Sequence, residues 1–168
     1  MLAPAFAAAL SLCALFAGDA SARHDAGARH AELIRRLVER ADPAAIEYVV
    51  KSVRSGMPPR SLEAFLEGAQ QAPHADYVPL LRRLTRYRKE RIRALALVAL
   101  AAFDDDHGAE AALLAMEDPS LDVRLLGVQL AERHTAPHVE EAMLLLLDRD
   151  ARVAKIVGRS SSTSTQGL

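Results

Sequence analysis

Apolar residues recur at the spacing of amphipathic α-helices from about residue 30 to residue 158. One such stripe covers residues 33–38, and another follows the Asp42-Pro43 pair, a combination typical of a helix start. No stretch alternates apolar and polar residues for long enough to indicate a strand. The pattern therefore predicts an all-α protein.

One block of sequence occurs three times in the second half of the chain. The copies are APHADYVPLL from Ala72, DDHGAEAALL from Asp105 and APHVEEAMLL from Ala136. Each contains a histidine, followed six and seven residues later by a Leu-Leu pair. The histidines are His74, His107 and His138, spaced by 33 and 31 residues. A second apolar stretch follows each copy, around Ile92, Val123 and Val153.

Self-similarity at this period is typical of proteins built from stacked structural repeats. The repeats predict helices over residues 77–86, 108–117 and 138–147, with partners over 89–103, 119–133 and 150–158. Because the linkers between them are short, partner helices are expected to run antiparallel. We therefore predict an α-solenoid of antiparallel helix pairs, with about nine helices in total.

Composition agrees with closely packed short helices. Hydrophobic residues make up 51% of the 168 positions, and aromatic residues only 4%. The apolar residues are mostly small or medium aliphatic ones, which allow close helix approach. The formal net charge of −1 gives no global attraction to nucleic acid.

The first 22 residues have the pattern of a signal peptide. An apolar run from Leu2 to Ala17 is short for a membrane span, and Ala20-Ser21-Ala22 suits signal peptidase. We predict cleavage after Ala22 and export to the periplasm or beyond the cell. An uncleaved anchor and a cytosolic helix are the alternatives, since no Lys or Arg precedes the run.

The rest of the chain is divided by composition. Residues 23–29 are expected to form a flexible lead-in, residues 30–158 the helical domain, and residues 159–168 a disordered polar tail. Cys13 is the only cysteine, and the residues around it fit a lipoprotein signal poorly. Cleavage would remove it, leaving no thiol for catalysis or redox chemistry.

A short motif in the repeats resembles the HEAT repeat, in its short bacterial, phycobilisome-lyase-like form. It consists of Asp118-Pro119-Ser120-Leu121-Asp122-Val123-Arg124, followed by the apolar Leu125, Leu126, Val128 and Leu130. Ile92-Arg93-Ala94-Leu95 is similar to the same element one repeat earlier. Asp148 with Val153 is similar to it one repeat later, with Ala154 in place of the arginine. The resemblance implies a right-handed α-solenoid that acts as a scaffold or binding surface.

We assign the aspartate and arginine of this motif a structural role. Asp118 is expected to cap the following helix. Arg124 would be buried between repeats and would need a carboxylate partner such as Asp118 or Asp122. This pair fixes the stacking of the repeats and performs no chemistry.

The histidines suggest a metal site, but geometry argues against one. Stacked helices lie about 8–10 Å apart, too far for three equivalent histidines to bind one ion. His134 and His138 are separated by Pro137, which interrupts a helix. His107 follows three aspartates that are expected to cap a helix. We therefore predict turn and cap roles, and no metal.

Basic residues are concentrated between residues 82 and 93, which we call the basic segment. It contains Arg82, Arg83, Arg86, Arg88, Lys89, Arg91 and Arg93, opposed only by Glu90. These charges could lie in solvent and pair with the acidic residues of 104–122, or they could bind an anionic partner. An acidic protein, a lipid head group and a polyanionic glycan are all compatible; Tyr87 alone offers little stacking for nucleic acid.

The sequence contains none of the common catalytic motifs, such as a nucleophile elbow, a phosphate-binding glycine loop or a zinc-binding His-Glu helix. We predict an exported, non-catalytic scaffold without a cofactor, which binds a protein through Arg82, Arg83, Arg86, Arg88, Lys89 and Arg91. The alternatives are an accessory subunit or lyase-like chaperone and a module that binds polyanions or anionic lipid. End-to-end self-association is a further possibility.

Overall fold

The computed structural model describes residues 25–134 and 136–163, with side chains through residue 159. These residues form helices and no strand, which confirms the all-α prediction. The predicted signal peptide and its cleavage site lie outside the described residues. Within these limits, no helix is both long and apolar enough to cross a membrane.

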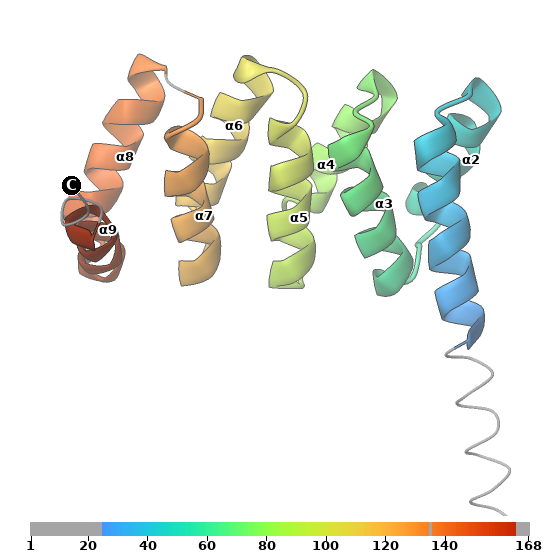
Figure 1. Cartoon of the computed structure of the whole chain (residues 1–168), viewed down its shortest axis with the longest axis horizontal. Helices are drawn as coiled ribbons and strands as arrows, with labels where there is room; N and C mark the ends of the chain where they lie inside the picture. The colour runs from blue at the N-terminus through green and yellow to red at the C-terminus, as the bar shows by residue number, and fades with distance from the viewer. Residues whose placement is uncertain (1–24, 135, 164–168) are drawn as a thin grey trace, which may run out of the picture.

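A first helix over residues 25–40 precedes eight labelled α-helices and one short 3-10 helix. The labelled elements are α2 (Pro43–Arg54), α3 (Pro59–Gln71), η1 (Ala75–Tyr77), α4 (Val78–Leu84), α5 (Glu90–Ala101), α6 (Asp105–Met116), α7 (Leu121–Ala131), α8 (Pro137–Arg149) and α9 (Ala151–Thr163). The helices succeed one another in chain order along the long axis of the molecule (Figure 1).

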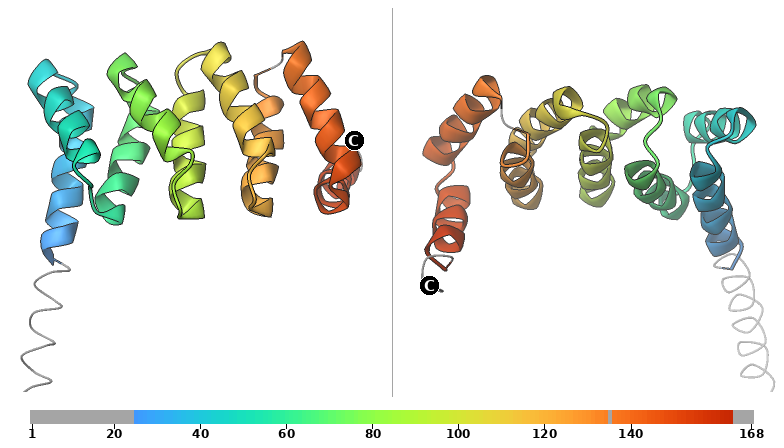
Figure 2. Two further views of the ribbon diagram at one scale, coloured as in Figure 1. Left: turned by 180° about the vertical axis from the view of Figure 1, so that it is seen from behind. Right: turned by 45° about the horizontal axis from the view of Figure 1, so that its top comes forward.

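The helices form two layers, as the views from both sides show (Figure 2). One layer contains α3, α5 and α7, which contact one another in sequence, and α7 also contacts α9. The other contains α4, α6 and α8, with α6 in contact with α8. Side chains between the layers form one continuous apolar core.

The repeated sequence block sets which residues enter this core. Ile92, Val123 and Val153, at equivalent positions of the three copies, are 0%, 1% and 0% exposed. Small residues let the helices approach closely: a Cβ at Gly127 of α7 would lie 2.8 Å from the backbone nitrogen of Met116 in α6. The scarcity of aromatic residues therefore follows from tight packing of helix against helix.

Helix starts agree with the expected capping chemistry at two places. The Asp42 carboxylate accepts a 2.8 Å hydrogen bond from the Ala45 N–H, with Pro43 as the first residue of α2. Asp104 accepts a 2.9 Å bond from the His107 N–H at the start of α6. Both carboxylates have a lowered pKa, with the backbone N–H bond as the main cause.

Both ends of the helical domain extend further than expected. Residues 25–29, placed in the lead-in, belong to the first helix, where alanines favour helix formation. The last helix, α9, continues to Thr163 and so includes part of the predicted polar tail. Serine and threonine are tolerated there because a helix already formed propagates at low cost.

Tyr77 places an unpaired hydroxyl in the core. Its side chain is 0% exposed and meets the Phe65 ring edge-on at 5.2 Å between centroids, and the hydroxyl has no hydrogen-bond partner among the described residues. Burial also raises the pKa of this phenol. A buried polar group without a partner costs about 1–3 kcal/mol.

Tyr77→Phe is therefore expected to raise the free energy of unfolding by about 1 kcal/mol, since it removes the orphan hydroxyl and keeps the ring. Urea unfolding followed by circular dichroism measures the change. Phe65→Leu, which perturbs the same ring contact without touching the hydroxyl, serves as the control and should lower stability. A loss of stability in Tyr77→Phe would mean that the hydroxyl has a partner.

Candidate functional site

Two arginines of the repeat motif are held in the same way. Arg93 of α5 forms a two-pronged ion pair with Asp118, with Nε–Oδ2 and Nη2–Oδ1 distances of 2.7 and 2.8 Å. Its Nη1 also donates to the backbone carbonyl oxygens of Tyr87 and Arg88, at 3.1 and 3.3 Å. The side chains are 12% and 5% exposed, so the pair lies almost entirely inside the protein.

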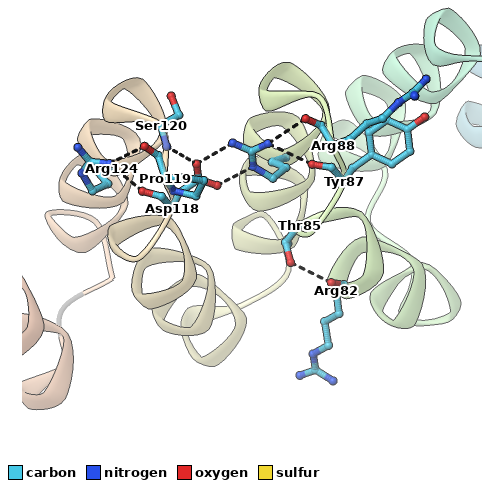
Figure 3. Close-up of polar contacts among 9 residues, drawn as sticks. Arg82, Thr85, Tyr87, Arg88, Asp118, Pro119, Ser120 and Arg124 are labelled. Carbon is cyan, nitrogen blue, oxygen red and sulfur yellow. Dashed lines mark hydrogen bonds and ion pairs between the residues drawn. The ribbon is translucent and has the colours of Figure 1, made fainter.

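Arg124 repeats this arrangement one helix pair later (Figure 3). It pairs with Asp150 at 2.8 and 2.9 Å, and its Nη1 donates to the backbone carbonyl oxygens of Asp118 and Pro119. In both cases the arginine joins the turn before its own helix to an aspartate 25 or 26 residues further along the chain. We call these two contacts the Arg–Asp ladder.

The expected carboxylate partner of Arg124 was therefore wrong. Arg124 reaches Asp118 through the backbone carbonyl, while the Asp118 carboxylate is bound by Arg93 and by the Ser120 N–H. Asp118 does not cap α7 as expected: it lies two positions before the N-cap residue, Ser120, and accepts a hydrogen bond from the N–H of Ser120 itself. Both oxygens of the Asp118 carboxylate thus accept hydrogen bonds from groups other than Arg124.

Opposing effects act on the Asp118 carboxyl group. Burial alone would raise its pKa, but the hydrogen bonds from Arg93 and Ser120 and the nearby charges of Arg93 and Arg124 lower it overall. Asp118 is thus held as a carboxylate whose hydrogen-bonding capacity is used within the fold. This arrangement is suited to fixing helices in place and not to proton transfer.

The ladder also shapes the loop that carries the basic segment. Arg93 holds the carbonyls of Tyr87 and Arg88, and the buried Thr85 hydroxyl donates to the Arg82 carbonyl at 2.9 Å (Figure 3). The loop between α4 and α5 is therefore fixed at both ends. Its exposed side chains project from a defined backbone.

Three of the seven cations in the basic segment are neutralised within the fold. Arg82 forms a bidentate pair with Glu110, Arg91 pairs with Glu63 at 3.1 Å, and Arg93 pairs with Asp118. The first two of these pairs are largely exposed. The structure thus assigns Arg82 and Arg91, both expected in a binding surface, to contacts within the chain.

The remaining four, Arg83, Arg86, Arg88 and Lys89, are exposed and have no ion-pair partner among the described residues. Arg83, Arg86 and Arg88 line a pocket of about 480 Å³, together with Arg54 from the last turn of α2. No acidic residue lines it. This pocket, which we call the basic pocket, is therefore lined by four arginines and by no acidic residue.

The wall of the basic pocket is apolar. Its other lining residues are Gly56 and the aliphatic or aromatic Val53, Met57, Leu62, Leu80, Leu84 and Tyr87. These come from α2, α3, α4, the loop between α2 and α3, and the loop between α4 and α5. A site with an apolar wall and a cationic rim fits a ligand that carries negative charge beside an aliphatic or aromatic group.

Sequence reasoning did not find Arg54 or the apolar wall. Arg54 lies 29 positions before Arg83, outside the basic segment, and the apolar wall residues have the spacing of ordinary core positions. The available signal was that Arg54 and Arg83 each lie in the last turn of a helix, α2 and α4, where a basic residue interacts favourably with the helix dipole.

The histidines have the roles of caps and local contacts. The His74 ring accepts a 3.3 Å bond from the Asp76 N–H, and His107 lies 2.7 Å from Asp104. His134 packs against Gly108 and contacts Asp105 at 3.1 Å, so it does not act together with His138 of α8. Among the described residues, no three His, Cys, Asp or Glu side chains are grouped to hold a metal ion.

Comparison of the chain with models of known protein families, with curated proteins and with solved structures gives no match.

Proposed function

We propose that this chain is a non-catalytic, HEAT-like α-solenoid whose basic pocket binds an acidic segment of a partner protein. The observation that carries the proposal is that four arginines and no acidic residue line the pocket, around an apolar wall. A guanidinium group binds carboxylates in a two-pronged geometry, and the wall adds a place for an apolar side chain.

Two features support the HEAT-like architecture. The Arg–Asp ladder recurs with a nearly constant sequence separation, 25 and 26 residues. The helices also follow one another in two layers, with contacts mostly between near neighbours in the chain (Figure 1). Proteins built in this way present extended surfaces, and binding is their commonest use.

The ligand is best described as a short acidic peptide with at least one large apolar side chain. A purely polyanionic ligand, such as a sulfated glycan, would use the arginines but leave the apolar wall uncovered. Burial of that wall by a ligand makes the free energy of binding more favourable, in proportion to the apolar area removed from water. We therefore favour a protein segment over a glycan.

We also propose that the chain is exported from the cytoplasm by its signal peptide, which is cleaved after Ala22. The lyase-like chaperone remains an alternative within the same architecture, because it too would work by holding another protein.

Binding of a fluorescent peptide rich in Asp and Glu with a central leucine tests the proposal. Charge reversal of Arg86 and Arg88 to Glu is expected to weaken binding at least about tenfold at low salt, since two favourable ion pairs become repulsive. Anisotropy titration gives the dissociation constants. Added salt should weaken the wild-type complex as screening increases.

Arg133→Glu is the matched control, because Arg133 is exposed, has no ion-pair partner among the described residues and lies outside the basic pocket. It should bind the peptide as the wild type does. A second peptide with alanine in place of leucine separates the two ligand classes. Equal affinity for both peptides would favour a polyanion site, and equal loss in Arg133→Glu would contradict the basic pocket.

A further inference from the structure

The Leu-Leu pair of the repeated block becomes more exposed toward the C-terminal end of the molecule. In α4 the pair is buried, with Leu80 3% and Leu81 0% exposed. In α6, Leu113 and Leu114 are half-buried and pack against the core. In α8, Leu144 and Leu145 are 64% and 63% exposed, the highest values among the exposed large apolar residues.

This trend has a physical cause in the order of the helices. The pairs in α4 and α6 lie in helices with further helices along the row, whereas α8 and α9 form the end of the described row (Figures 1 and 2). α8 is the last helix of its layer in the described part of the chain, so no further helix there covers its outer side. Exposure of two adjacent leucines to water is unfavourable, and a partner that buried them would gain binding free energy.

Charges on the last two helices indicate what that partner is. On α8, Glu141 and Asp148 lie seven residues apart on either side of the leucines, at spacings that place all four on one helix face. They have no ion-pair partner among the described residues. The described part of α9 contains no acidic residue, and its exposed Arg152 and Lys155 have no ion pair there either.

The end of the described row thus carries an acidic helix, α8, and a basic helix, α9, which contact each other. A two-fold axis that passes between α8 and α9 can place α8 of one copy over α9 of the other, and α9 over α8. Each such contact unites opposite charges around the leucines. A two-fold arrangement with α8 over α8 would instead bring like charges together.

We propose that the α8–α9 end binds the same end of a second copy of this chain, with Leu144 and Leu145 of each copy buried in the contact and α8 packed against α9 of the partner copy. The resulting dimer is closed, because the same surface is used by both copies. It places the two basic pockets far from the interface, so it does not depend on the proposed function.

Sedimentation velocity of the purified chain, at concentrations up to about 1 mM to include weak complexes, tests this inference. The wild type should show a monomer–dimer equilibrium with no larger species. Leu144→Ser with Leu145→Ser should shift the dissociation constant upward at least about tenfold. The matched control is Leu33→Ser with Tyr48→Ser, two residues that are each 46% exposed near the opposite end; it should dimerise normally.

Charge reversal decides the arrangement of the two copies. Variant A carries Glu141→Lys and Asp148→Lys, and variant B carries Arg152→Glu and Lys155→Glu. Each variant alone should be monomeric, and a chain with all four changes should dimerise with itself but not with the wild type. Circular dichroism checks that every variant is folded.

Several results would overturn the inference. One is a wild type that stays monomeric throughout, as expected if another protein covers this end. Another is open-ended growth, or loss of the dimer in the Leu33 and Tyr48 control, since both indicate a head-to-tail contact. A four-change chain that remains monomeric would also contradict the packing of α8 on α9.

Discussion

Replacing Asp118 by alanine is expected to lower the free energy of unfolding by about 3 kcal/mol. The change leaves the guanidinium of Arg93 in a site where its side chain is 12% exposed, without the carboxylate that balances its charge. It also removes the acceptor of the Ser120 N–H at the start of α7. Urea unfolding followed by far-ultraviolet circular dichroism measures the loss.

Glu110→Ala is the matched control, since it breaks a bidentate arginine pair of similar geometry at an exposed position. Exposed ion pairs contribute about 0–1 kcal/mol, because water and salt screen them and two flexible side chains lose freedom. The two variants should thus differ several-fold in their effect. Equal effects would mean that the Arg–Asp ladder is no more than surface charge.

The same carboxylate should give stability a dependence on acid pH. The pKa of Asp118 is lowered in the folded protein from its ordinary value of 3.8, so the unfolded chain takes up its proton first as the pH falls. The stabilisation is therefore complete above pH 3.8 and is lost as the pH drops through the lower folded value. The Asp118→Asn variant lacks this carboxylate and its pH-dependent stabilisation. The difference in unfolding free energy between wild type and variant should therefore be constant from neutral pH to about 4 and shrink below that.

The ladder illustrates what could be predicted from the sequence. The motif residues and their register were identifiable because a helix start needs a cap and a buried arginine needs a carboxylate. The pairing of these residues could not be predicted. Asp118 and Arg124 are close in sequence, whereas the true partner of Arg124 is Asp150, 26 positions away. A choice between carboxylates is decided by helix packing, which local spacing does not contain.

The basic pocket differs from the basic segment for a similar reason. The sequence shows where cations are concentrated but not which are neutralised, and both Glu63 and Glu110 lie 28 positions from their arginines. Arg54 joins the pocket only because α2 ends beside the loop after α4. Charge density along the chain therefore did not reveal that Arg82 and Arg91 have ion-pair partners, nor that the other arginines lie beside apolar residues.

Gly127→Ala is expected to lower the free energy of unfolding by about 2 kcal/mol, although alanine favours helices over glycine by about 1 kcal/mol. The added Cβ would lie 2.8 Å from the Met116 backbone nitrogen and 3.1 Å from the Ala115 carbonyl carbon. A backbone cannot rotate away as a side chain can, so α6 and α7 would have to separate along their shared surface. The loss of packing there exceeds the gain in helix propensity.

Gly158→Ala tests the same substitution where nothing lies within 4 Å of the new Cβ. Only the propensity gain then remains, and stability should rise by about 0.5–1 kcal/mol. The two variants therefore shift the urea midpoint in opposite directions from wild type. A shift of the same sign in both would contradict the close approach of α6 and α7, on which the tight stacking of small residues in this fold depends.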